Sequence, residues 1–223
     1  MDFILGIFKL YIERFSFFFE LLIQHIMLSA IAILFTTIIG ITLGIYITRN
    51  KKIASIVLGV NNFIYTIPSI ALFGFLVAIS GIGNTSALIA LTVYGVLPII
   101  RNTYVGINEV DSQVIESAVA MGSTDRQLLF KVQLPLALPV IIAGFRIMVV
   151  MTIALAGIAS FIGAGGLGVA IWRGITTNFP EMTAAGSILV ALLAVIVDYF
   201  LGLVEKKAKS KAIGTRKKGD TKK

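Results

Sequence analysis

Long uncharged stretches recur along the chain and predict membrane-spanning helices, each of which needs about 20 apolar residues. Residues 21–48 carry no formal charge and predict one span. Residues 53–100 are also uncharged but are too long for a single helix, and the turn residues at 80–84 divide them. The five predicted spans cover residues 21–48, 56–79, 86–105, 136–158 and 184–204. The pattern therefore predicts an all-α integral membrane domain over residues 21–204.

The distribution of Lys and Arg predicts the orientation of these spans. Five spans place the two ends of the chain on opposite sides of the membrane. One side would hold Arg49, Lys51, Lys52, Arg101, Arg126, Lys131 and the C-terminal tail, and the other Lys9, Arg14 and Arg173. The positive-inside rule assigns the side richer in Lys and Arg to the cytoplasm. We therefore expect the N-terminus outside, and residues 106–135 and the C-terminus in the cytoplasm.

Residues 1–20 mix aromatic and apolar side chains with Lys9, Glu13 and Arg14. A cleavable signal peptide is not expected, because these charges interrupt the apolar stretch and no small-residue cleavage site follows. The composition favours a helix that lies at the outer membrane interface. An additional partial span is the alternative.

Composition agrees with a membrane protein and limits the chemistry. The chain is 57% hydrophobic and 13% charged, with a mean hydropathy of +0.97, whereas soluble domains are about 25% charged. There is no cysteine, which excludes disulfides and thiol catalysis, and the lone His25 excludes a HExxH zinc site. Residues 205–223 hold nine Lys and Arg, a basic cytoplasmic tail suited to anionic lipid rather than to nucleic acid. We expect no metal, cofactor or catalytic residue.

The longest polar interruption before the tail, residues 109–135, predicts a short amphipathic helix. Asp111 or Ser112 can cap its start, and Gly122 stands where a helix closes with a left-handed residue. One face at helical spacing carries Val114, Ile115, Ala118 and Met121.

A second helix is expected directly after this turn. Ser123 or Thr124 can cap it, and Thr124 with Gln127 matches a capping box. Pro135 and Pro139 mark the entry into the fourth span. An amphipathic helix on the cytoplasmic side suggests docking into a partner groove, and a helix lying on lipid would have the same pattern.

The same stretch resembles the EAA loop of binding-protein-dependent ABC importer permeases. That loop has Glu-Ala-Ala, three residues, Gly, nine residues, Ile, one residue and Leu-Pro. The matching residues here are Glu116, Ser117, Ala118, Gly122, Val132, Leu134 and Pro135. Ser117 replaces the first Ala, and Val132 replaces Ile. The resemblance implies that this loop enters a cleft of an ATPase subunit, with Glu116, Ala118 and Gly122 coupling the two proteins.

Two further segments are similar to permeases for osmoprotectants, namely residues 97–104 and 160–168, and His25 fits the start of the first core span. The resemblance implies the type I ABC importer permease (MetI-like) fold and import of glycine betaine, carnitine or choline across the cytoplasmic membrane. Val169 departs from the pattern, which has an acidic residue there. A permease for methionine or another small nutrient is the alternative, and an ion-coupled carrier is disfavoured because no internal repeat is evident.

The implied partners are two ATPase subunits, a second permease subunit and an extracellular binding protein. The chain contains no GxxxxGK[ST] phosphate loop, so a separate polypeptide is expected to hydrolyse ATP. The string at Gly163, Gly165 and Gly168 is no dinucleotide site, because a membrane helix precedes it in place of a strand. With Gly166, these glycines predict a flexible external turn, which is a candidate gate.

Other intramembrane residues remain candidates for structure or for transport. Tyr65, Pro68, Tyr94 and Tyr104 interrupt the second and third spans, and they fit either helix packing or a translocation path for quaternary ammonium ions. Arg146 and Asp198 are charges within spans; they either pair or reach the interface. Gly40 and Gly44 form a GxxxG motif typical of close helix packing.

Overall fold

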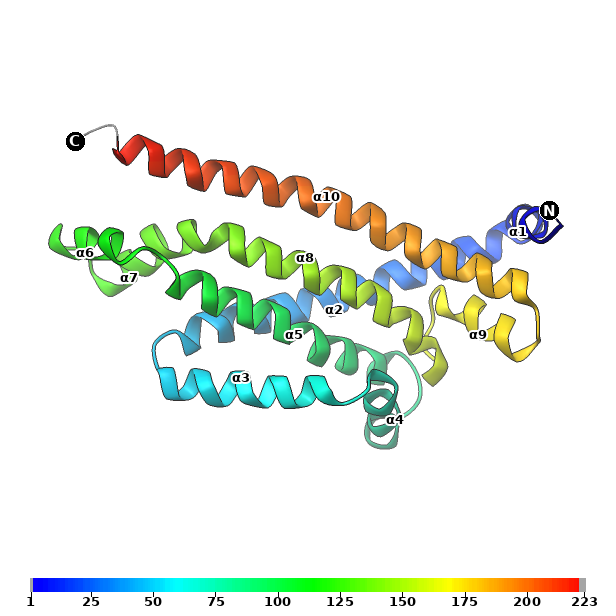
Figure 1. Cartoon of the computed structure of the whole chain (residues 1–223). Coiled ribbons are helices and arrows are strands. Elements are labelled where there is room, and N and C mark those ends of the chain that lie inside the picture. The colour runs from blue at the N-terminus through cyan, green and yellow to red at the C-terminus, as the bar shows by residue number, and fades with distance from the viewer. Residues whose placement is uncertain (1, 221–223) are drawn as a thin grey trace. The chain divides into compact units, whose positions relative to one another are not determined.

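The computed structural model describes residues 2–220, with side chains through residue 211. This part of the chain is helical and contains no strand (Figure 1). Its α-helices are α1 (Asp2–Glu13), α2 (Phe15–Ile47), α3 (Lys51–Thr66), α4 (Ser69–Ser80), α5 (Asn84–Asn108), α6 (Ser112–Ala120), α7 (Asp125–Gln127), α8 (Leu134–Ala159), α9 (Gly168–Thr176) and α10 (Pro180–Asp220). A π-helical turn, η1 (Leu128–Gln133), leads into α8, and a 3-10 turn, η2 (Ser160–Ile162), follows it.

The long helices match the predicted spans, and one of these spans is broken. Within the described residues, α2, α5, the run Asp125–Ile162 and α10 are each long and apolar enough to cross a membrane. The pair α3 and α4 makes a fifth span only if counted together, because the two helices are bent by 98° at a short break. The span predicted over 56–79 is therefore present only as a sharply bent pair, and it begins earlier, at Lys51. Pro68 stands at the break, where it lacks an N–H and disfavours a helical conformation of the residue before it.

One compact unit comprises residues 1–36, 63–95 and 149–198. Its first core cluster joins α2, α4, α5 and α8 through residues such as Leu28, Phe73, Leu91 and Ala156. Its second core cluster joins α1, α2, α9 and the start of α10. The Tyr11 hydroxyl on α1 donates to the Ala185 carbonyl at 2.8 Å, and burial raises the pKa of this phenol, so it stays a protonated donor.

The other compact unit comprises residues 37–62, 96–148 and 199–223. Here glycines let helices approach closely. A Cβ at Gly44 of α2 would lie 2.6 Å from Cβ of Thr103 on α5, and a Cβ at Gly40 would collide with Ile99. The GxxxG motif therefore packs α2 against α5 within the chain, which confirms its predicted packing role.

The N-terminal segment divides at Arg14. Helix α1 ends at Glu13 and α2 begins at Phe15, so the predicted boundary at residue 20 falls inside α2. Large apolar side chains of α1 are exposed, among them Phe3, Ile4 and Phe8. Such a surface suits an interfacial helix, which stays a prediction.

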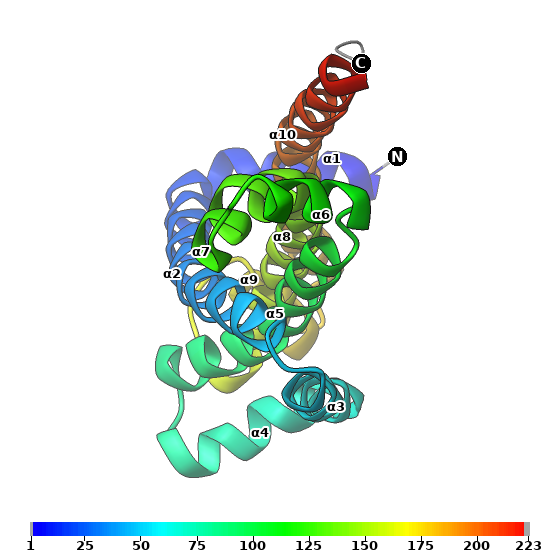
Figure 2. The ribbon, with the colours of Figure 1, turned by 90° about the vertical axis from the view of Figure 1, so that its left-hand side faces the viewer.

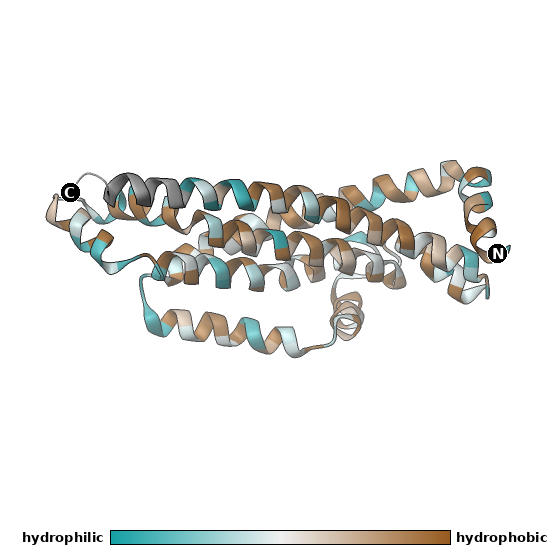
Figure 3. Cartoon of the chain, turned by 45° about the horizontal axis from the view of Figure 1, so that its top comes forward, coloured by the Kyte–Doolittle hydropathy of each residue, from teal (hydrophilic) through white to brown (hydrophobic). Residues whose placement is uncertain are grey.

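Helix α10 exposes more apolar surface than the other candidate spans do. Only 6% of its apolar window is buried within the chain, against 44% for α5. Figure 3 shows apolar residues along most of α10 and polar residues further on. A helix with this much exposed apolar surface needs lipid or another subunit beside it. The basic tail begins inside α10 at Glu205, and its side chains beyond residue 211 lie outside the described part.

Candidate functional site

The first half of the segment 109–135, which we call the coupling segment, folds as a capped helix followed by a tight turn. The Asp111 carboxylate caps α6 by accepting from the Gln113 N–H at 3.0 Å. At the other end Gly122 has φ +82°, and its N–H donates to the Val119 carbonyl at 2.9 Å. The Ser123 N–H donates to the Ala118 carbonyl at 3.1 Å. This is a Schellman closure, and it confirms the predicted helix and glycine turn.

The second half begins with the predicted capping box. The Thr124 N–H donates to Gln127 Oε1 at 2.9 Å, and the Gln127 N–H donates to Thr124 Oγ1 at 3.4 Å. The helix then widens into η1, where the Leu134 N–H bonds the Leu129 carbonyl five residues back. Pro135 explains this widening, because it offers no N–H to the Lys131 carbonyl and its ring crowds that group. Pro139 lies inside α8.

The coupling segment exposes apolar side chains as well as the residues of the EAA-like pattern. Ala118 is buried and Ile115 is half-buried, so part of the predicted face packs inward, where α6 contacts η1. Val119, Met121 and Phe130 are 54%, 80% and 63% exposed. Figures 1 and 2 show α6 and α7 at the ends of α5 and α8. This apolar surface lies beyond the membrane-length helices and has no cover within the described chain.

The other residues of the EAA-like pattern surround the same turn. Glu116 is exposed, and so is Ser117, whose hydroxyl donates to the Gln113 carbonyl at 2.7 Å. Leu134 packs on the core cluster around Ile99 and Ala137, and Pro135 is exposed beside it. The carboxylate of Glu116 is therefore free to meet a partner, while Leu134 anchors the start of α8.

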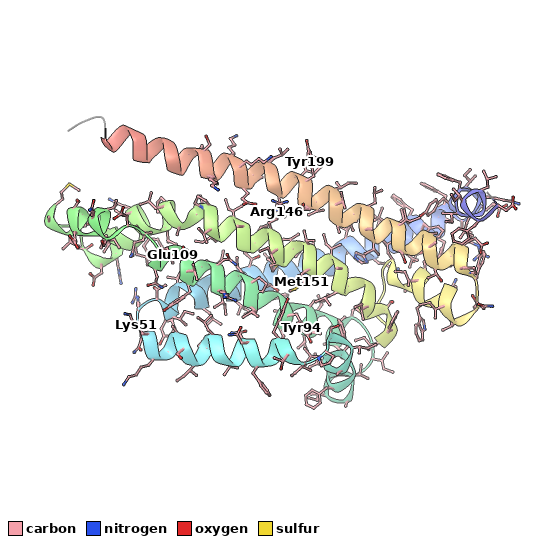
Figure 4. The ribbon with its side chains drawn as sticks, in the orientation of Figure 1. Lys51, Tyr94, Glu109, Arg146, Met151 and Tyr199 are labelled. Carbon is pink, nitrogen blue, oxygen red and sulfur yellow. The ribbon has the colours of Figure 1, made fainter. Side chains whose placement is uncertain are left out.

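A second group of candidate residues gathers at the bend between α3 and α4. The rings of Tyr65 and Tyr94 meet edge to face with centroids 5.8 Å apart. The Tyr94 hydroxyl donates to the Ile67 carbonyl, directly before Pro68, and the Tyr65 hydroxyl donates to Met151 Sδ at 2.9 Å. Figure 4 shows Tyr94 and Met151 on neighbouring helices, α5 and α8. Sequence reasoning missed Met151, because nothing in its spacing distinguishes it from a core residue.

Tyr104, the fourth residue predicted for the translocation path, does not belong to this group. It lies in the other compact unit, where it packs against the cluster of Ile47, Ala54, Val96 and Ile100. Packing accounts for its position.

The predicted glycine turn lies between η2 and α9 and is held by hydrogen bonds. The Gly165 N–H donates to Asn84 Oδ1 and the Gly166 N–H donates to Gln24 Oε1, each at 3.2 Å. Gly163 and Gly166 have φ of +78° and +103°, which explains glycine at both positions. A Cβ at Gly168 would collide with the Gly157 carbonyl oxygen.

The clamp residues of this turn, Gln24 and Asn84, were not recognised from the sequence. Helix α9, which follows the turn, was not predicted either. Both clamps are amide side chains near the ends of predicted spans, a signal that could have identified them. The Val169 side chain, at the expected acidic position, packs in the second core cluster.

Arg146 forms an ion pair that the sequence did not single out. Its Nη1 lies 2.9 Å from Glu205 Oε2, with side chains 33% and 29% exposed. Among the described residues, no three His, Asp or Glu side chains come together in a way that could hold a metal ion.

Comparisons with known proteins identify the family of this chain. A sequence profile described as "Binding-protein-dependent transport system inner membrane component" matches residues 38–210. The chain belongs to this family. A glycine betaine/carnitine/choline transport system permease protein of Bacillus subtilis (strain 168) is 44% identical over 184 residues, covering 82% of this chain and 80% of the relative.

Two other similarities add to this assignment. An ergothioneine transport permease/ergothioneine binding protein of Helicobacter pylori (strain G27) is 43% identical over 75% of this chain and 30% of that longer protein. The inward-facing MetNI methionine ABC transporter has a chain that matches with a TM-score of 0.78 at 22% identity, covering 88% of this chain and 98% of that one. The predicted type I ABC importer permease (MetI-like) fold is therefore confirmed. The inner membrane component described here is a multi-pass transport permease subunit.

Proposed function

We propose that this permease subunit takes its energy from a separate ATPase that docks on the coupling segment. The observation that carries the proposal is the exposed apolar surface of Val119, Met121 and Phe130 beside the exposed Glu116. If the orientation predicted from Lys and Arg holds, the segment lies on the cytoplasmic side of the membrane, where it is accessible to a soluble partner. We infer that a cleft on such a partner, rather than the lipid surface, covers these apolar side chains.

The rest of the assembly follows from the family. Five spans are too few to enclose a translocation path, so a second permease subunit completes it. The exposed apolar face of α10 can contact such a subunit. A binding protein delivers substrate at the outer face; the Helicobacter relative, whose name joins permease and binding protein, supports this arrangement. The N-terminus lies outside and the C-terminus lies in the cytoplasm.

The substrates we propose are small molecules with a trimethylammonium group. Glycine betaine, carnitine, choline and ergothioneine, named for the relatives at 43–44% identity, all carry this group. Methionine, named for a structural neighbour at 22% identity, shares only the fold with this chain. ATP binding draws the ATPases together and moves the coupling segments, which turns the cavity outward, and hydrolysis resets it.

The clamped turn of Gly163, Gly165, Gly166 and Gly168 is a candidate outer gate in this cycle. Its hydrogen bonds to Gln24 and Asn84 are intact in the structure. Each bond is to an amide side chain, so the turn can be released without breaking a helix.

Charge reversal tests the docking proposal. Glu116→Lys should lower ATP-dependent uptake at least about tenfold, because it places a like or unpaired charge in the docked interface. The measurement is uptake of labelled choline, betaine, carnitine and methionine into proteoliposomes that contain the ATPase and the binding protein.

Glu109→Lys is the matched control. Glu109 is exposed, lies seven residues earlier and undergoes the same change of charge (Figure 4). Equal uptake and equal co-purification of the ATPase with both variants would refute docking at Glu116. If only methionine enters with the wild-type subunit, the substrate proposal is wrong and the docking proposal stands.

A further inference from the structure

The orientation predicted from Lys and Arg places the bend between α3 and α4, a stretch of irregular backbone, within the membrane. Helix α3 starts at Lys51, on the predicted cytoplasmic side, and its 16 residues rise about 24 Å before the break. That distance lies inside a hydrocarbon core about 30 Å thick. The bend therefore has no access to the water outside the bilayer unless a cavity reaches it.

The backbone at the bend is only partly satisfied. Tyr94 donates to the Ile67 carbonyl, and the Thr66 hydroxyl donates to the Phe63 carbonyl at 2.7 Å. Within the described residues, the carbonyl oxygens of Tyr65 and Thr66 receive no backbone N–H. Open carbonyls are tolerated at this depth only where they line a water-filled cavity or are covered by protein.

The side chains at the bend are also exposed to solvent. Tyr65 is 44% exposed, and Thr66 and Pro68 are exposed too. The chain itself therefore does not cover the bend. Its free carbonyls disfavour lipid, so in the assembled importer the bend either lines the aqueous path or is covered by the second permease subunit.

The groups at this position suit one class of solute. A quaternary ammonium ion has no N–H to donate and carries its charge on methyl groups, which are attracted to aromatic faces and to carbonyl oxygens. The Tyr65 hydroxyl donates to Met151 Sδ, and its ring packs against the Tyr94 ring. These two contacts fix the Tyr65 ring while it stays partly exposed.

We propose that the bend is a binding station for trimethylammonium groups inside the permease, formed by the Tyr65 ring and the Tyr65 and Thr66 carbonyls. Tyr94 and Met151 position the ring. The station rests on the proposed import function and adds a second point of selection, within the membrane, after delivery by the binding protein.

Uptake of labelled choline by the complete importer in proteoliposomes tests the station. Tyr65→Leu removes the ring and should lower choline uptake per ATP hydrolysed about tenfold. Tyr65→Phe keeps the ring, loses only the bond to Met151, and should stay within about twofold of wild type. Tyr46→Leu, at an exposed aromatic position on α2 that has no proposed role, should leave uptake unchanged.

The outcomes separate the station from the proposed function. If the wild-type importer takes up choline and Tyr65→Leu does so equally well, the station is overturned and the proposed import function stands. The same holds if Tyr65→Phe is as impaired as Tyr65→Leu. Binding-protein-stimulated ATPase activity shows that each variant assembles.

A direct binding measurement covers the case in which wild type imports no choline or Tyr65→Leu fails to assemble. The chain has one tryptophan, so Tyr65→Trp in a Trp172→Phe background reports on the bend alone. Choline should change its emission in a saturable way, while 3,3-dimethylbutan-1-ol, the uncharged isostere, should not. Equal responses to both compounds, or no response to choline, would overturn the station; Tyr199→Trp is the control.

Discussion

The glycine turn after α6 and the bend after α3 both interrupt helices, but they satisfy their backbone groups in different ways. At Gly122 the freed groups bond to residues within five positions along the chain. At Pro68 the freed Ile67 carbonyl accepts from Tyr94, which is 27 residues away, and two neighbouring carbonyls receive no backbone donor within the described chain. The first interruption is complete by itself and can act as a rigid docking unit. The second depends on its surroundings and suits a position on a transport path.

The largest expected change in stability tests the dependence of the bend on Tyr94. Tyr94→Phe removes the donor to the carbonyl of the half-buried Ile67, and leaving such a group unpaired costs about 1–3 kcal/mol where water does not replace the donor. Thermal unfolding of the purified subunit in detergent should show a lower midpoint. Tyr199→Phe, which removes an exposed hydroxyl, is the control. Equal midpoints for the two variants would mean that the bend does not need its distant donor.

A glycine comparison tests the local character of the turn. Gly122→Ala adds a Cβ in open space but at φ +82°, where a side chain costs about 1–2 kcal/mol. Gly59→Ala adds the same atom in open space within α3, where alanine favours the helix. Hydrogen exchange of the α6 amides should accelerate in the first variant only, and ATP-dependent uptake should fall with it. Unchanged exchange in both variants would show that the turn is not what orders α6.

The capping box gives a smaller and equally local effect. Thr124→Ala removes the acceptor for the Gln127 N–H and should destabilise the start of α7 by about 1 kcal/mol. Thr124→Ser keeps the hydroxyl and should restore most of the stability. Hydrogen exchange over residues 125–133 measures both. A serine variant as labile as the alanine variant would point to the lost methyl group instead.

The same contrast explains what the sequence could predict. The caps and the Schellman glycine act over a few residues, so Gly122 was predicted in its role, and Asp111 and Thr124 were each one of two predicted cap candidates. The 98° bend was missed although Pro68 was noticed, because proline inside a span is compatible with a kink or with a full break. At the full break, Tyr94 donates a hydrogen bond to the freed Ile67 carbonyl, and no pattern of nearby residues in the sequence predicts that contact. The Gln24 and Asn84 clamps were missed for the same reason.

The ion pair of Arg146 and Glu205 sharpens the comparison from the side of the coupling segment. It joins α8, which follows the coupling segment, to α10. Like the hydrogen bond from Tyr94 at the bend, it is a contact between residues far apart in the sequence. Both side chains are about one third exposed, so water and salt screen the pair, and a coupling energy of about 1 kcal/mol or less is expected. A double-mutant cycle of Arg146→Met and Glu205→Gln, read by thermal unfolding, measures it. Since the turn at Gly122 bonds only to its own neighbours, α6 exchange should be the same across the cycle. Accelerated exchange of α6 in either single variant would show that the coupling segment also relies on distant contacts, and the difference between the two interruptions would then be one of degree.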